Sequence, residues 1–226
     1  MSGDLKPFAE WLAPKFASGG SMVRSRSTYE TGKRAFDVFA TLLIGPFALV
    51  VVCILALVIC LDGESAFFGQ PRLGKDGKVF NLWKLRTMVP DAERKLQAYL
   101  EADPAARAEW ERTQKLQHDP RVTAVGKYLR RFSADELPQL LNIFLGHMSF
   151  VGPRPMLPEQ RPLYPGTAYF AMRPGLTGLW QISERNACTF AERALYDTRY
   201  AGIMSFSTDL WILLQTPAVV FRGTGV

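Results

Sequence analysis

The longest hydrophobic stretch of the chain runs from Val38 to Leu61 without a charged residue. Its 24 residues exceed the roughly 20 that a helix needs to cross the ~30 Å hydrocarbon core of a bilayer. Gly45 and Pro46 interrupt the run, and a proline removes a backbone hydrogen bond and clashes with the preceding helical turn. The pattern therefore predicts a membrane helix that breaks at Gly45 and Pro46.

Positive charges flank this hydrophobic run on both sides. Lys33 and Arg34 precede it, while Arg72 and Lys75 follow it. Positive flanks stay on the cytoplasmic side of a membrane, so both ends of the run are expected on that side. This favours a re-entrant helix–break–helix over residues 33–61 that enters one leaflet and returns; a single crossing is the alternative.

The rest of the pattern predicts an α+β fold that is mostly helical, with a compact cytosolic domain over residues 62–226. Asp76 and Gly77 separate two short strands and are typical of a hairpin turn. Residues 1–32 have little pattern and are expected to be a mobile tail. Further helices are predicted from Asp91, from Asp103, over Leu137–Leu145 and over Thr208–Phe221. The last of these is amphipathic, as expected of a core helix or of an interfacial helix that helps to anchor the domain.

Composition and charge narrow the choice of partners. A net charge of +6 and a pI near 9.3 favour an anionic partner, either membrane lipid headgroups or a phosphorylated substrate. Nucleic acid is the competing anion, but the sequence has no nucleic-acid recognition motif and no basic ladder interleaved with aromatics. The three cysteines and two histidines lack the spacing of a disulfide framework or a zinc site, which favours a reducing cytoplasm.

Two adjacent acids, Asp135 and Glu136, stand where the sequence predicts a helix to begin. Pro138 is tolerated in the first turn, which places the N-cap between Ser133 and Asp135. The free N–H groups and the dipole at a helix start keep a carboxylate ionised and attract phosphate. An ionised carboxylate can act as a nucleophile or a metal ligand. The alternative is ordinary helix capping, because Ser133-x-x-Glu136 is also a capping box.

A stiff loop carries the next candidate residue. Arg154 lies between Pro153 and Pro155 and follows Gly152, so the backbone on both sides of Arg154 is restricted. A guanidinium on a rigid loop is suited to two-point binding of a phosphate; an incidental surface arginine is the alternative. Acids close to so many cations point to phosphate chemistry.

A series of motifs in this chain resembles the bacterial sugar transferases. These are small monotopic phosphoglycosyl transferases that begin exopolysaccharide or O-antigen synthesis on undecaprenyl phosphate. The resemblance extends from about residue 32 to the C-terminus and is greatest to the undecaprenyl-phosphate galactose or glucose phosphotransferases. The motifs that carry it are Lys33-Arg34-x-x-Asp37, the apolar run with its proline, Lys84-Leu-Arg86-Thr-Met, Asp135-Glu136-Leu-Pro-Gln, Gly152-Pro-Arg-Pro and Arg173-Pro-Gly-Leu-Thr-Gly-Leu-Trp-Gln.

The resemblance implies a two-step reaction at the bacterial inner membrane, on its cytoplasmic face. Asp135 would attack the sugar-bearing phosphate of UDP-galactose or UDP-glucose and release UMP; undecaprenyl phosphate would then take the phosphosugar from the aspartate. Mg²⁺ would be held by Asp135, Glu136 and the diphosphate, with Glu136 orienting the metal or assisting proton transfer. Gly45 and Pro46 would form the membrane break. The implied substrate-binding residues are Lys84, Arg86, Arg130, Gly152, Pro153, Arg154, Pro155 and Arg173.

The chain departs from the family pattern at two positions. Glu184 stands where glycine is usual, and His147 where an acid is common. A catalytically silent, membrane-anchored scaffold for polysaccharide assembly is therefore the alternative function, against which the intact Asp135–Glu136 pair argues. Exposed amphipathic helices leave room for a homodimer.

Overall fold

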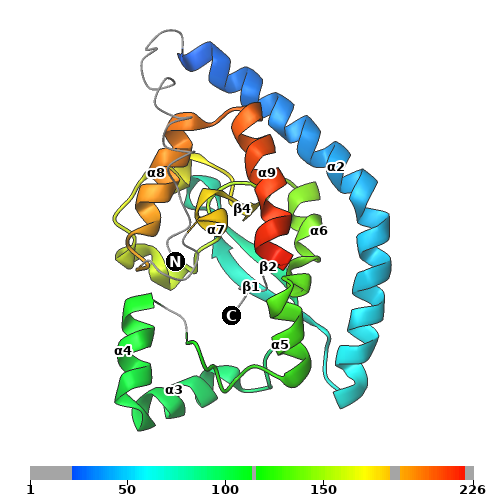
Figure 1. Cartoon of the computed structure of the whole chain (residues 1–226), viewed down its shortest axis with the longest axis vertical. Helices are drawn as coiled ribbons and strands as arrows, with labels where there is room; N and C mark the ends of the chain where they lie inside the picture. The colour runs from blue at the N-terminus through cyan, green and yellow to red at the C-terminus, as the bar shows by residue number, and fades with distance from the viewer. Residues whose placement is uncertain (1–21, 114–115, 184–188, 222–226) are drawn as a thin grey trace.

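The computed structural model describes residues 22–113, 116–183 and 189–221 (Figure 1). This part of the chain is mostly helical and carries two small sheets, which confirms the predicted fold class at that level. The main helices and strands are α2 (Met22–Ile59), β1 (Phe67–Leu73), β2 (Val79–Leu85), α3 (Ala92–Ala102), α4 (Pro104–Thr113), α5 (Ala124–Arg131), α6 (Gln139–Phe144), β3 (Ser149–Val151), β4 (Gly175–Thr177), α7 (Leu179–Ile182), α8 (Arg193–Ile203) and α9 (Phe206–Phe221).

The predicted hairpin is present, and its turn chemistry explains it. Strands β1 and β2 pair antiparallel, with Phe67 opposite Leu85 and Leu73 opposite Val79. At the turn, Asp76 and Gly77 have φ angles of 60° and 73°, in the left-handed region that aspartate tolerates and glycine favours. The parallel pairing of β3 with β4 was not predicted, because each strand has only three residues.

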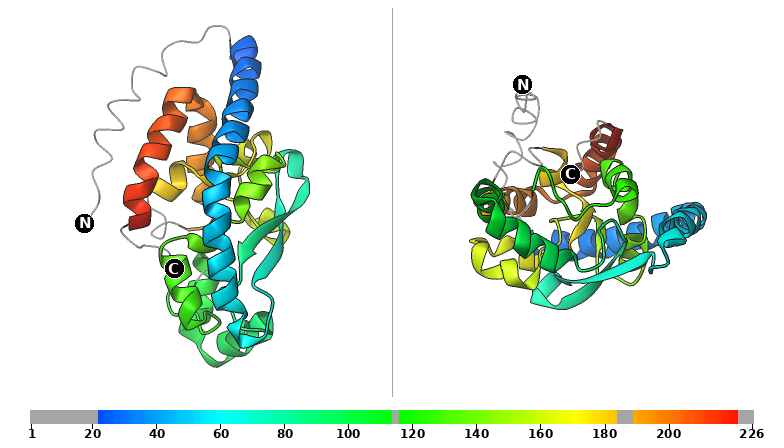
Figure 2. Two further views of the ribbon diagram at one scale, coloured as in Figure 1. Left: turned by 90° about the vertical axis from the view of Figure 1, so that its right-hand side faces the viewer. Right: turned by 90° about the horizontal axis from the view of Figure 1, so that it is seen from below.

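Helix α2 differs from the prediction in two ways. It begins at Met22, within the predicted tail of residues 1–32, and it continues through Pro46 to Ile59 instead of breaking. Figures 1 and 2 show one helix that bends as it runs along the outside of the domain. Continuation is feasible because Gly45 precedes the proline: a residue with a Cβ would clash with the proline ring, and glycine has none.

Most of the apolar surface of α2 faces outward. Phe39, Phe47 and Leu57 are 66%, 76% and 72% exposed, whereas Val52 and Ile59 are buried against the domain. By length and composition, α2 is the one helix in the described residues that is long and apolar enough to cross a membrane. Contact between this outward face and lipid would shield it from water.

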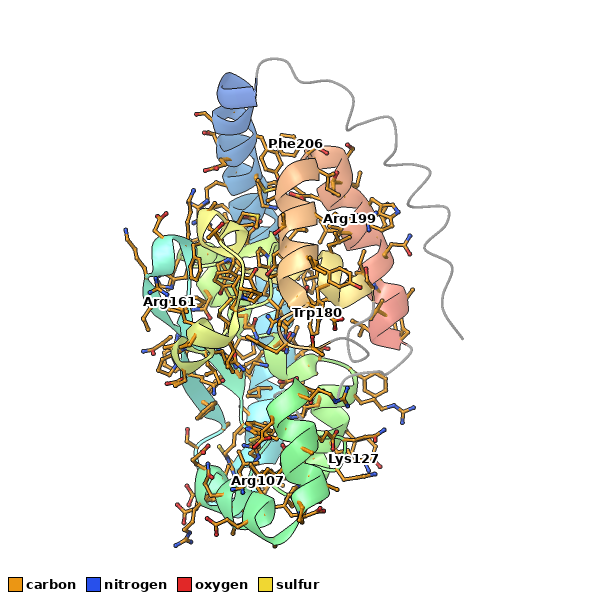
Figure 3. All side chains as sticks on the ribbon, turned by 90° about the vertical axis from the view of Figure 1, so that its left-hand side faces the viewer. Arg107, Lys127, Arg161, Trp180, Arg199 and Phe206 are labelled. Atoms are coloured by element: carbon orange, nitrogen blue, oxygen red, sulfur yellow. The ribbon has the colours of Figure 1, made fainter. Side chains whose placement is uncertain are left out.

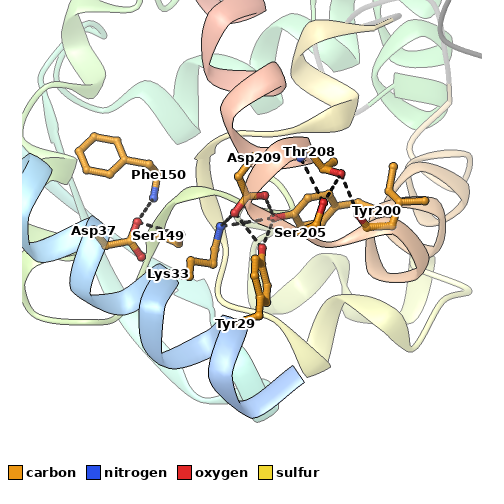
Figure 4. A network of polar contacts seen from close by, with 10 residues as sticks. Tyr29, Lys33, Asp37, Ser149, Phe150, Tyr200, Ser205, Thr208 and Asp209 are labelled. Carbon is orange, nitrogen blue, oxygen red and sulfur yellow. Dashed lines mark hydrogen bonds and ion pairs between the residues drawn. The ribbon is translucent and has the colours of Figure 1, made fainter. Parts of the chain in front are cut away.

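The Lys33-Arg34-x-x-Asp37 motif fastens α2 to three elements of the domain. Lys33 Nζ lies 2.5 Å from Asp209 Oδ2 on α9, and Asp37 Oδ1 accepts hydrogen bonds from the Phe150 N–H and the Ser149 hydroxyl at β3 (Figure 4). Arg34 donates to the carbonyls of Ile143 and Phe144 at the end of α6. The three residues are close in sequence but point to different partners, so they fix both the position and the rotation of the helix.

The described residues form four hydrophobic clusters. The largest lies among α6, β3 and α9 and includes Ile143, Met148 and Ile212, all fully buried. A smaller one joins α3 to α4 through Leu96 and Ala106. Asp103 accepts hydrogen bonds from the N–H groups of residues 105 and 106, which confirms it as the predicted cap of α4. Leu137, which follows the two acids in the chain, packs against the largest cluster.

Candidate active site

Asp135 and Glu136 form a buried acidic pair, with exposed fractions of 5% and 8%. They lie in a short 3-10 turn before α6, not in the first turn of the α-helix as predicted, because α6 begins only after Pro138. Ser133 has a left-handed φ of 54° and its side chain makes no capping hydrogen bond. A cap needs an extended backbone, so the capping-box alternative does not describe this pair.

Lys84 joins the two carboxylates. Its Nζ lies 2.8 Å from Glu136 Oε1 and 3.3 Å from Asp135 Oδ2. The guanidinium of Arg154 adds a second cation, 3.3 Å from the same Glu136 oxygen. Charge-assisted contacts of this kind are short and strong, so they hold the two carboxylates in place as a candidate nucleophile and ligand.

Arg130 lies behind the acidic pair on α5. Its Nε donates to the Thr87 hydroxyl at 2.9 Å, which orients the guanidinium. Burial lowers the pKa of Arg130, and the negative charges of Asp135 and Asp119 oppose that shift. Arg130, predicted to bind substrate, therefore interacts with Asp135 through charge, while its Nε hydrogen bond goes to Thr87.

The loop of residues 152–155 is held through its backbone. The N–H of Gly175 donates to the Pro153 carbonyl, and the Gly152 N–H donates to the Thr177 carbonyl. A Cβ at Gly152 would lie 2.3 Å from the Arg173 carbonyl oxygen, so only glycine permits this approach. Gly152, Pro153 and Pro155 thus shape the loop, and Arg154 is the member whose side chain reaches the acids.

A small pocket opens beside the acidic pair. The residues that give it its chemistry are Arg72, Lys84, Glu136, Gln139, Arg154 and Pro155. Among them three cations face one carboxylate, so the pocket favours an anion. Sequence reasoning missed Arg72, whose buried Nε has no hydrogen-bond partner. Burial, with repulsion from Arg154 and Arg193, lowers the pKa of Arg72 to about 10.

The hairpin register explains why Arg72 belongs to the pocket. Arg72 pairs with Phe80 and Phe68 pairs with Lys84, and residues of equal parity lie on one face of a strand pair. Arg72 and Lys84 therefore share a face. The Asp76-Gly77 turn fixes this register. Alternation of side chains on the two strands that flank the turn would therefore have placed Arg72 on the same face as Lys84.

Two predicted phosphate ligands lie elsewhere. Arg86 donates to the Ser65 and Ile59 carbonyls at the end of α2, at 2.7 and 3.2 Å. Arg173 donates to the Gly146 carbonyl after α6 at 3.1 Å. Both bind backbone carbonyls at or just after the C-terminal end of a helix, where carbonyls lack partners within the helix, as basic residues commonly do. Glu184, the departure near the expected sugar site, lies outside the described residues.

The acidic pair is adjacent to the apolar helix. Ala134 and Leu137, on either side of the two acids, pack against a cluster that contains Val52 and Ile59 of α2. The carboxylates therefore lie close to the segment whose outer face is bare hydrocarbon.

Comparisons with known proteins agree with this arrangement. The family model described as "Bacterial sugar transferase" matches residues 28–223. The chain is 48% identical over 200 residues to "Exopolysaccharide production protein ExoY" of Sinorhizobium fredii, covering 85% of this chain and 87% of the relative. It is 40% identical over 195 residues to "Undecaprenyl-phosphate galactose phosphotransferase" of Salmonella typhimurium and to "UDP-galactose-lipid carrier transferase" of Erwinia amylovora, each covering 85% of this chain and 41% of the relative. The chain belongs to the bacterial sugar transferase family.

Proposed function

We propose that this protein transfers hexose-1-phosphate from a UDP-hexose to undecaprenyl phosphate and releases UMP, as the first membrane step of exopolysaccharide synthesis. The observation that carries the proposal is the buried Asp135–Glu136 pair, bonded to Lys84 and Arg154 beside a cationic pocket and next to the apolar helix α2. The pocket chemistry suits a diphosphate, and the helix suits a lipid acceptor. The names of two relatives, "UDP-galactose-lipid carrier transferase" and "Undecaprenyl-phosphate galactose phosphotransferase", support a sugar-nucleotide donor and a lipid-carrier acceptor.

Asp135 is the proposed nucleophile. One of its oxygens bonds to the sugar-bearing phosphorus while the bond from that phosphorus to the oxygen of the departing UMP breaks. A phosphate oxygen of undecaprenyl phosphate then attacks the same phosphorus, and the aspartyl oxygen leaves as the carboxylate. Asp135 suits the role because it is buried beside a cation, so its carboxylate is held in place without a full hydration shell.

Lys84, Arg72 and Arg154 are the proposed phosphate-binding residues. They line one pocket, and phosphoryl transfer depends mainly on positioning and on neutralising charge at the phosphate oxygens. Glu136 holds both Lys84 and Arg154, so it sets the place of two of these cations.

Mg²⁺ is part of the proposal. The described residues contain no group of three or more His, Cys, Asp or Glu side chains arranged for a metal. Mg²⁺ is commonly held by one or two carboxylates together with substrate phosphates, which the Asp135–Glu136 pair and a bound diphosphate would provide. When bound, the ion would supply charge neutralisation at the diphosphate.

The proposed location is the cytoplasmic face of the bacterial inner membrane, with α2 entering one leaflet. The exposed apolar outer face of α2 and the basic residues that precede and follow its apolar run in the sequence support this placement. Undecaprenyl phosphate would then reach Asp135 from the lipid side, past Ala134 and Leu137. Assembly as a homodimer is a separate expectation, which the particle mass of the nanodisc-embedded protein would test.

Intact-mass spectrometry tests the proposed chemistry. Nanodisc-embedded protein is incubated with Mg²⁺ and single UDP-hexoses, without polyprenyl phosphate, and we expect a hexose-phosphate adduct together with released UMP. Asp135→Asn should abolish both, whereas Asp91→Asn, the same change at an exposed acid, should abolish neither. Release of UMP only after undecaprenyl phosphate is added would point to direct transfer. No UMP release under either condition would favour the scaffold.

A further inference from the structure

Arg193 is a buried cation outside the proposed phosphate pocket. It is the first residue of α8, and its exposed fraction is 8%. The carboxylate that interacts with its charge is that of Asp197. Burial lowers the pKa of Arg193, and Asp197 opposes that shift. Burying a charge is unfavourable unless the group is paired and hydrogen-bonded, so the contacts of Arg193 should explain why it is buried.

Those contacts lead to Arg154. Arg193 Nη2 donates a hydrogen bond of 2.8 Å to the Arg154 carbonyl oxygen, and Arg72 Nη1 donates one of 3.0 Å to the next carbonyl, that of Pro155. Two guanidiniums from distant parts of the chain thus hold consecutive carbonyls of one loop. The loop cannot rotate about Arg154 without breaking one of these bonds.

Trp180 provides a second connection. The guanidinium carbon of Arg193 lies 5.0 Å from the centre of the Trp180 ring, and that of Arg154 lies 6.0 Å from the same ring. Phe190 adds another ring 4.9 Å from Arg193. Planar guanidiniums stack on aromatic faces, so Trp180 orients the Arg154 side chain while Arg193 holds its backbone.

The charges explain why this arrangement calls for an anion. Arg154 and Arg193 each lower the pKa of Arg72, and Arg154 also lowers that of Arg193, so the three cations repel one another. A diphosphate beside Arg72 and Arg154 would relieve that repulsion. Without the fixed loop, Arg154 would move away from its like-charged neighbours and lose its alignment with the pocket.

We infer that Arg193 is a positioning residue, which holds the Arg154 loop through its carbonyl and, with Trp180, aims Arg154 at the phosphate pocket. This inference rests on the proposed function only in taking a nucleoside diphosphate as the ligand. The hydrogen bond of Arg193 goes to the backbone of this loop, so its effect on the pocket should pass through Arg154.

A double-mutant cycle tests the inference on the nanodisc-embedded protein, with the affinity for UDP measured by calorimetry. We expect Arg154→Met to weaken UDP binding by about 30-fold and Arg193→Met by about 10-fold, within the range found for charged contacts. In the double variant, loss of Arg193 should add less than about 2-fold, because Arg154 is no longer there to be aimed. Arg161→Met is the matched control: Arg161 stacks on Phe170 at 5.3 Å and lies well away from Trp180 in Figure 3.

Several outcomes would overturn the inference. One is a double variant whose loss of UDP affinity equals the product of the two single losses. The others are an unchanged UDP affinity in Arg193→Met, or a loss of affinity in Arg161→Met equal to that in Arg193→Met. If Arg193→Met does not fold, Arg193→Lys replaces it; lysine keeps the charge but lacks the planar fork, and its weakening of at least about 3-fold should vanish in the Arg154→Met background. Wild-type protein that fails to bind UDP would also refute it. UDP binding with normal coupling but no sugar-phosphate transfer would refute only the proposed function.

Discussion

The ammonium group of Lys84 lies 2.8 Å from the Glu136 carboxylate and is also within 3.3 Å of Asp135. One flexible cation therefore bridges both buried acids. In the proposed reaction a phosphate enters the same pocket, and Lys84 can move toward it while Glu136 remains bonded to Arg154. Lys84 would in this way leave Asp135 free at the moment when its attack is needed.

Replacing Lys84 tests that dual role. Lys84→Met should reduce kcat for sugar-phosphate transfer by about 10²–10³-fold, the usual effect of removing one preorganised donor at a reacting oxyanion. It should also lower the free energy of unfolding by roughly 1–3 kcal/mol, because two buried acids lose a partner. Transfer assays and thermal unfolding measure the two effects. Lys84→Arg keeps the charge and should recover most of the stability; a Lys84→Met protein with normal kcat would remove Lys84 from the mechanism.

The attachment of α2 to α9 depends on one buried carboxylate. Asp209 accepts hydrogen bonds from Tyr29 at 2.7 Å, from Lys33 at 2.5 Å and from Tyr200 at 2.6 Å (Figure 4). Asp209→Ala removes the carboxylate that accepts from these three donors, so we expect a loss of about 3–5 kcal/mol, as for breaking a buried ion pair. Glu101→Ala, at an exposed acid of α3, should change stability by less than about 0.5 kcal/mol. Equal unfolding temperatures for the two variants would show that the network does not hold the helix.

Gly152 should be intolerant of any side chain. In Gly152→Ala the new Cβ would lie 2.3 Å from the Arg173 carbonyl, so the β3–β4 pairing must open and the Arg154 loop must shift. We expect UDP affinity to fall at least about 10-fold, with a loss of stability of about 2 kcal/mol or more. Gly202 of α8 is the control, because nothing lies within 4 Å of an added Cβ. Gly202→Ala should be neutral or stabilising by up to about 1 kcal/mol, and an equal loss of affinity in both variants would contradict this explanation.

The sequence was most informative where conformation is decided locally. The Asp76-Gly77 turn, the Asp103 cap and Gly146, whose φ is 83°, all follow from the preferences of one or two residues. The acidic pair was also recognised as a candidate, because Asp135 and Glu136 are consecutive in the chain and Pro138 follows them closely. The start of the α-helix was misplaced because the left-handed turn at Ser133 allows a separate 3-10 turn before Pro138.

The partners of the arginines were much harder to predict. Arg86 and Arg173 belong to motifs of the family, yet they bind backbone carbonyls just after the ends of helices. Arg72 was interpreted only as a positive flank of the hydrophobic run and Arg193 was not a candidate, although one lines the pocket and the other holds its loop. A guanidinium is long and has five donors, so its partner depends on which backbone ends tertiary packing brings near, and no local pattern records that.

The pH dependence of stability provides a test of the support beneath Arg193. The Asp197 carboxylate accepts a 2.7 Å hydrogen bond from the Tyr164 hydroxyl, and burial raises the pKa of Asp197 to about 6. An acid with a pKa near 4 when unfolded and about 6 when folded holds its proton more tightly in the folded protein. Its contribution to the free energy of unfolding is therefore largest below about pH 4, and it declines by on the order of 2–3 kcal/mol as the pH rises to about 6.

Asp197→Asn removes this titration while keeping an acceptor for Tyr164. Relative to the wild type, the variant should gain roughly 5–10 °C in unfolding temperature between pH 4 and pH 6.5, with little further change above that. Thermal unfolding across this range measures the difference, and Asp91→Asn serves as the exposed control. A wild-type-minus-variant difference that is constant with pH would show that Asp197 is ionised throughout. In that case Asp197 would act as a full counter-ion to Arg193, and its removal should weaken UDP binding at every pH.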